Sequence, residues 1–103
     1  MVEKNYTYSE KAAKWWANKV SSSTSDLVRG IIPFEKSLEE EIRKNISLRG
    51  HMNISTYCSH SKLLEEVAIK SQLSASIPCG YEMKILFDKV YVYNSQGSLV
   101  AAF

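Results

Sequence analysis

The fold of this chain is decided by the stretch Ala12-Ala13-Lys14-Trp15-Trp16-Ala17-Asn18-Lys19-Val20, which holds its two tryptophans side by side. Neighbouring residues of an α-helix point about 100° apart, so the two large rings cannot both face one core. Trp15 falls on the flank of the helix, beside Lys11 and Lys19. The sequence therefore predicts that Trp16 anchors the core and that Trp15 lies at its edge. Four residues share the predicted inner face: Ala12, Ala13, Trp16 and Val20.

Two helices are predicted in the first half of the chain. The first begins near Thr7 and ends at about Val20 or Ser21. The serine-rich stretch 21–26 that follows predicts a flexible loop, because its polar side chains have no apolar surface to bury. Pro33 suits the first turn of a second helix, since a proline there costs no hydrogen bond, and Gly50 is a suitable end for it. An apolar residue every fourth position predicts one buried stripe, formed by Phe34, Leu38, Ile42 and Ile46.

The second half of the chain alternates apolar and polar residues, which is typical of β-strands. The first predicted strand is His51–Cys58, and Ser59 or Ser61 caps a third helix after it. That helix has an inner stripe of Leu63, Leu64, Val67 and Ala68. Three further strands are predicted after a connector, Ser74–Gly80, at Tyr81–Phe87, Lys89–Asn94 and Ser98–Phe103.

The resulting order of elements, ααβαβββ, predicts an α+β fold: an antiparallel sheet of three to four strands with helices packed on one face. A chain of 103 residues is the usual size of one domain, so residues 1–103 are expected to form a single domain. If the apolar strand positions face the helices, then Tyr57, Tyr91 and Tyr93 face away from them, with Glu82 and Lys84. The predicted inward positions are Met83, Ile85, Phe87, Val90 and Val92.

Composition and charge exclude several classes of protein. A net charge of +2, with basic and acidic residues interspersed, is too small to indicate a nucleic-acid-binding protein and does not fit an acidic mimic of DNA. No apolar run approaches the ~20 residues of a membrane-spanning helix. The N-terminus, Met1-Val2-Glu3-Lys4-Asn5, does not have the pattern of a secretory signal. We therefore expect a cytoplasmic protein with no membrane partner.

No catalytic residue, cofactor site or metal site is predicted. The chain lacks the common phosphate-loop, dinucleotide, zinc-protease and serine-hydrolase motifs, so we expect a protein that is not an enzyme. Cys58 and Cys79 are expected to be reduced thiols, and a disulfide between them stays open. Cys58-Ser59-His60 lacks the further ligands that a closed zinc site needs. The run Glu39-Glu40-Glu41 is interpreted as a solvated helix face.

Two groups of side chains are candidates for contacting a partner. Trp15 with Lys11 and Lys19 has the composition of an interface hot spot, because a partly exposed tryptophan buries much area. Tyr57, Tyr91 and Tyr93 form the second group, which suits a protein or stacked bases. The plainer interpretation of both groups is packing within the fold, with the tyrosine hydroxyls in water.

Three segments carry a resemblance to small proteins from phages and mobile elements of Gram-positive bacteria. They are Lys14–Lys19, Phe34–Ile42 and Ile54–Tyr57 with Leu63–Ala68. In that group a KWWA-type helix precedes an F-x-x-x-L-x-x-x-I helix. The chain departs from the group at Thr56-Tyr57-Cys58-Ser59, where the group tends to have Asp-Tyr-Gly-Pro before the third helix.

The group is in turn similar to anti-CRISPR proteins of the type II-A class. The resemblance implies a non-enzymatic inhibitor of a type II CRISPR RNA-guided nuclease, which binds the effector or blocks its guide loading. It assigns no role to any single residue, and it does not give the oligomeric state. The alternative is a small nucleic-acid-binding or regulatory protein of a phage or mobile element, which contacts its target through Tyr91, Tyr93 and basic neighbours.

Overall fold

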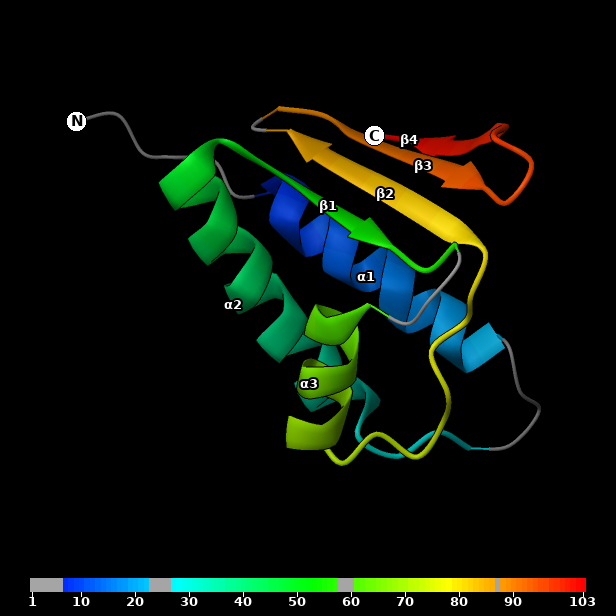
Figure 1. Cartoon of the computed structure of the whole chain (residues 1–103). Helices are drawn as coiled ribbons and strands as arrows, with labels where there is room; N and C mark the ends of the chain where they lie inside the picture. The colour runs from blue at the N-terminus through cyan, green and yellow to red at the C-terminus, as the bar shows by residue number, and fades with distance from the viewer. Residues whose placement is uncertain (1–6, 23–26, 58–60, 87) are drawn as a thin grey trace.

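The computed structural model describes residues 7–22, 27–57, 61–86 and 88–103. Its elements follow the predicted order and form an α+β fold (Figure 1). Residues 23–26 of the predicted serine-rich loop (21–26), Cys58 and Phe87 lie outside the described residues. The helices are α1 (Thr7–Ser22), α2 (Ile31–Arg49) and α3 (Lys62–Lys70), and the strands are β1 (His51–Ser55), β2 (Tyr81–Leu86), β3 (Val90–Asn94) and β4 (Leu99–Ala102).

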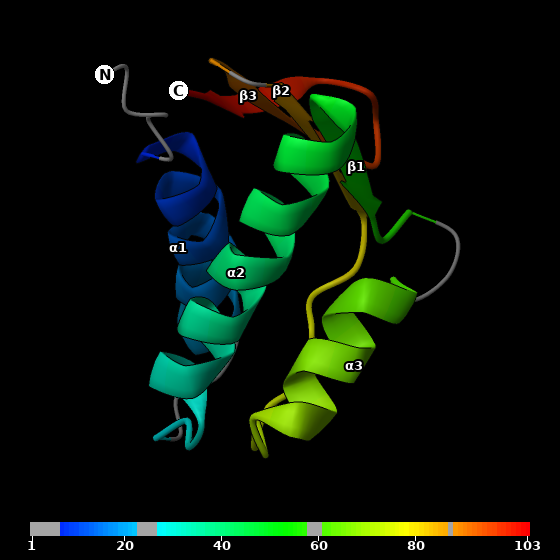
Figure 2. The same ribbon diagram turned by 90° about the vertical axis from the view of Figure 1, so that its left-hand side faces the viewer.

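The four strands form one antiparallel sheet in the order β1-β2-β3-β4. Figure 2 shows that the three helices lie on the same side of this sheet, with α3 towards the end of β1. The predicted arrangement of helices on one face is therefore confirmed. Of the helices in the described ranges, none has the length and hydropathy to cross a membrane.

The core lies between α1, α2 and the sheet, and it confirms the predicted phase of the first helix. Trp16 is completely buried, whereas Trp15 is half-buried. Met83, Ile85, Val90 and Val92 are also buried as predicted, and they share the core with the stripe of α2; the fifth predicted inward position, Phe87, lies outside the described residues. Besides alanines, the core comprises Trp16, Val20, Phe34, Leu38, Ile42, Ile46, Ile54, Leu64, Val67, Met83, Ile85, Val90 and Val92.

Helix α2 begins earlier than the sequence predicts, at Ile31 rather than near Pro33. Gly30 precedes it in the left-handed region (φ 80°), and its carbonyl accepts the first helical hydrogen bond, from Phe34 N at 2.9 Å. The predicted stop is confirmed, because Gly50 also has φ 80° and donates to the carbonyl of Ile46 at 2.8 Å.

Two other boundaries differ from the prediction. Ser21 and Ser22 belong to the last turn of α1 and not to a loop. Strand β1 ends at Ser55. Thr56 N still donates to Tyr81 O at 2.7 Å, but Tyr81 N donates to the side-chain Oγ1 of Thr56 at 3.1 Å, and the Thr56 carbonyl accepts from Gly80 N instead. Of the two predicted caps of α3, Ser59 and Ser61, the structure has Ser61, whose Oγ accepts from Leu64 N at 3.3 Å.

Candidate functional site

The exposed flank of α1 holds Trp15 in a cluster of aromatic rings. Its ring meets that of Trp16 edge to face, with centroids 5.0 Å apart, and that of Tyr81 in the same way at 5.2 Å. Tyr81 reaches this position because it is the first residue of β2 and shares a face with buried Met83. We call Trp15, Lys19 and Tyr81 the Trp15 surface.

Lys19 completes the Trp15 surface from the next turn of α1. Its Nζ lies 5.4 Å from the centroid of Trp15 and 5.3 Å from that of Tyr81. An ammonium over an exposed ring contributes about 0.5–1 kcal/mol, and each edge-to-face pair about 0.5–1.5 kcal/mol. These contacts restrict the Trp15 ring before any partner arrives, so less conformational entropy remains to be lost on binding.

Lys11 shares the flank of Trp15 but covers a different ring. Its Nζ lies 5.3 Å from the centroid of Tyr8. Lys11 also lines a charged hollow of about 320 Å³ between α1 and α2, together with Glu10, Lys14, Glu35 and Glu39. The structure therefore brings Trp15 and Lys19 together and leaves Lys11 in a separate, more acidic environment.

The predicted tyrosines lie on the sheet face that no described helix covers. Tyr91 is paired with Lys84, and Tyr93 with Glu82, across β2 and β3. The Nζ of Lys84 lies 5.6 Å from the centroid of Tyr93. Because directly opposite residues of a sheet share a face, these four side chains form one mixed aromatic and charged area.

Tyr57 has a structural role on the same face. Its hydroxyl donates to the carbonyl of Asn94 at 2.5 Å, which links the end of β1 to the end of β3. Partial burial raises the pKa of Tyr57 above its ordinary value, and the charges of Glu82 and Tyr93 act in the same direction. The sheet separates Tyr57, Tyr91 and Tyr93 from the Trp15 surface, so the two candidate groups do not form one site.

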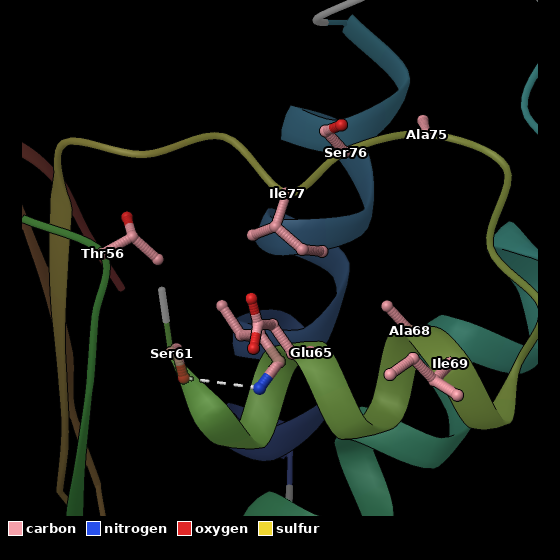
Figure 3. A pocket seen from close by; sticks show the side chains of 9 residues that line it. Thr56, Ser61, Glu65, Ala68, Ile69, Ala75, Ser76 and Ile77 are labelled. Atoms are coloured by element: carbon pink, nitrogen blue, oxygen red, sulfur yellow. Dashed lines mark hydrogen bonds between the residues drawn. The ribbon is translucent and has the colours of Figure 1, made fainter. Parts of the chain in front are cut away.

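A third feature, not predicted from the sequence, is a groove of about 360 Å³ between α3 and the connector before β2 (Figure 3). Ile69 stands outside the buried stripe of α3 and is 78% exposed. In the sequence, the groove is indicated only by these apolar residues outside the predicted core: Ile69 on α3, and Ala75 and Ile77 in the connector. The groove is lined by Thr56, Ser61, Leu64, Glu65, Ala68, Ile69, Ala75, Ser76 and Ile77.

Within residues 7–22, 27–57, 61–86 and 88–103, no three His, Cys, Asp or Glu side chains are placed to hold a metal ion. Cys79 is an exposed, free thiol.

Comparisons with protein-family models, with curated proteins and with solved structures found no match to this chain.

Proposed function

We propose that this protein acts by binding another protein, and that its target is the type II CRISPR effector nuclease implied by the sequence resemblance. One observation carries the binding role: a tryptophan held at the surface by two other rings and one ammonium group. Interface hot spots are enriched in tryptophan and tyrosine because their large rings bury much area. Through such a residue the protein would bind the effector and inhibit it directly, or would block the loading of its guide RNA.

Lys19 gives the Trp15 surface a positive charge, because its ammonium group lies over the Trp15 ring. Lys14 lines the separate hollow between α1 and α2. Charges at the rim of an interface mainly steer the encounter and select the partner. The Trp15 surface is therefore expected to dock on an acidic region of the effector, with the ring at the centre of the contact.

The test is a titration of a purified type II effector against the purified protein, which is added in one series after the guide RNA and in a second series before it. A tight-binding inhibitor acts stoichiometrically, so half an equivalent should leave about half of the DNA cleavage activity. Trp15→Ala combined with Lys19→Glu should abolish inhibition. The matched control is Lys36→Glu, which makes the same charge change at an exposed site on α2 and should inhibit normally.

Circular dichroism establishes that both variants are folded before inhibition is compared. Inhibition of excess nuclease by a trace of the protein would indicate catalysis and contradict the proposal. Full inhibition by the folded Trp15→Ala, Lys19→Glu variant would show that the Trp15 surface does not contact the effector. Lys11→Glu is tested separately, because Lys11 covers Tyr8 rather than Trp15.

The lysine over Tyr93 supports a second candidate function, namely nucleic-acid binding on the open sheet face. Bases stack on aromatic rings, and nearby lysines contact phosphates. Binding to nucleic acid without the nuclease, weakened by salt and lost in Tyr91→Ala and Tyr93→Ala, would favour this function over the first.

A further inference from the structure

Strand β4 lies at one edge of the sheet (Figure 1), and beyond it the described part of the chain has no further strand. Phe103 N donates to Val90 O at 3.0 Å, and Val90 N donates to Phe103 O at 2.8 Å. Pairs that exchange both bonds alternate with pairs that exchange none in an antiparallel sheet. The next pair is Tyr91 with Ala102. The N–H and C=O of Ala102 therefore point away from β3, towards the edge.

The same edge presents apolar side chains. Ala101 lies opposite Val92 and Leu99 lies opposite Tyr93, so Val100 is an extra residue that has no opposite residue in β3. Such a bulge residue is left out of the regular ladder. Leu99 is 53% exposed and Val100 is 47% exposed. A strand added beside β4 would therefore meet unpaired backbone groups and apolar side chains together.

The edge carries no charge that would keep a second strand away. Residues 90–103 contain no Asp, Glu, Lys, Arg or His, although the whole chain has 13 basic and 11 acidic residues. Edge strands are commonly blocked by charged side chains, by proline or by a bulge. Of these features β4 has the bulge at Val100 and neither of the others. Two copies of the chain can therefore bring their β4 edges together without repulsion between like charges.

We propose that β4 pairs antiparallel with β4 of a second copy of this chain, about a two-fold axis beside Ala101 and Ala102. A two-fold axis joins the same surface of both copies, so that surface must complement itself. Ala102 meets this condition, because it directs one donor and one acceptor to the same side. A charged strand would fit less well, since burying a charge beside Leu99 and Val100 is costly. The inference goes beyond the proposed function, because it involves neither the nuclease nor the Trp15 surface.

The test measures the oligomeric state of the purified chain by sedimentation equilibrium, with reductant present because Cys79 is an exposed thiol. A contact of a few residues per copy is smaller than a standard interface, so we expect a weak dimer that dissociates between about 10 μM and 1 mM. The Ala102 amide should exchange more slowly with solvent as the protein concentration rises. In a mixture of isotope-labelled and unlabelled copies, nuclear Overhauser contacts between copies should fall at residues 99–103.

Two variants block the edge in different ways. Ala102→Pro removes an N–H that β3 does not use, so the chain keeps its own sheet and loses a bond to the second copy. Val100→Lys places like charges close together in the dimer. Each should weaken the dimer at least tenfold. The matched controls should dimerise as the parent does: Ala102→Ser keeps the N–H, and Asn53→Lys adds the same charge at an exposed residue of β1, on the opposite edge.

Circular dichroism establishes that each variant is folded, and Val100→Lys decides the outcome if Ala102→Pro is not. A chain that stays monomeric up to about 1 mM would overturn the proposal. A dimer that Val100→Lys leaves unchanged, or contacts between copies that fall outside β4, would overturn it as well.

Discussion

At the residue scale, the two tryptophans have different structural roles although they are neighbours. Trp16 is completely buried, so Trp16→Ala should lower the free energy of unfolding by about 3–5 kcal/mol. Trp15→Ala removes edge contacts of a half-buried ring and should cost distinctly less, about 1–2 kcal/mol. Urea denaturation of both variants measures the difference. A larger loss for Trp15→Ala would contradict the helix phase.

Trp16 also allows a milder, matched substitution. Its indole N–H is buried and has no hydrogen-bond acceptor among the described residues. Trp16→Phe keeps an aromatic ring in the core and removes that N–H, so it should cost clearly less than Trp16→Ala. This comparison separates the loss of apolar packing from the loss of a polar group.

Tyr57 predicts a pH dependence of stability. Its pKa is raised above its ordinary value of 10.0 by partial burial, and by the charges of Glu82 and Tyr93. A raised pKa means that the folded chain holds the proton more tightly than the unfolded chain. The resulting stabilisation is complete below the unfolded pKa and is lost as the pH rises through the folded pKa.

Tyr57→Phe tests this linkage, because it removes the proton and the hydrogen bond to Asn94. In an ultraviolet absorbance titration, the variant should lack the tyrosine that ionises at raised pH. Its stability should also fall less steeply above about pH 10. Tyr91→Phe is the control: it should keep the tyrosine that ionises at raised pH and the steep fall of stability above about pH 10. Identical titrations of the parent and Tyr57→Phe would contradict the assignment.

Single residues show where the sequence was informative. Helical phase alone identified Trp16 as the core ring, because it depends only on neighbours along one helix. Tyr81 was not identified as the partner of Trp15, although its strand was predicted. Their contact depends on how α1 crosses the start of β2, and no local pattern specifies that crossing.

At the scale of elements, Gly30 determines how closely α2 approaches α3. A Cβ at this position would lie 2.6 Å from Ser71 O and 2.8 Å from Gln72 O, and the backbone there has φ 80°. Gly50 has the same φ but nothing within 4 Å of an added Cβ. Comparing alanine substitutions at Gly30 and Gly50 therefore separates the cost of a steric clash, which arises only at Gly30, from the cost of the left-handed conformation, which arises at both.

Gly50→Ala should cost about 1–2 kcal/mol, the strain of a left-handed alanine. Gly30→Ala should cost that amount and about 1–3 kcal/mol more, because rigid backbone atoms must move. Thermal or urea unfolding measures both losses. Equal losses would show that the α2–α3 junction accommodates a methyl group without strain.

Element boundaries were less predictable than element identities. The stripe of α2 and the cap of α3 follow from repeats and spacing within each segment. The start of α2 at Ile31 involves the carbonyl of Gly30, and the end of β1 involves Thr56 bonding to Tyr81. The second interaction joins segments distant in sequence, which single-segment periodicity cannot reveal.

At the scale of the whole molecule, the order of elements determined the α+β class, and alternation determined which strand residues face the helices. The groove beside α3 was not predictable in this way. Ile69 and Ile77 were each visible as apolar residues outside the expected core, but only the packed structure makes them face one space. The same holds for the Trp15 surface, which joins α1 to β2.

Because α3 lies between β1 and β2 in the sequence, the strands of the sheet are expected to pair in a particular order during folding. Strands β2, β3 and β4 follow one another closely in the sequence, whereas β1 is separated from β2 by α3 and the connector. Pairing of β1 with β2 therefore closes the longest loop in the sheet. Contacts between distant segments carry the larger loop-closure cost. Val92→Ala should therefore slow folding, and Ile54→Val should mainly speed unfolding, as stopped-flow chevron plots can measure. Equal slowing by both would mean that all four strands assemble in one step.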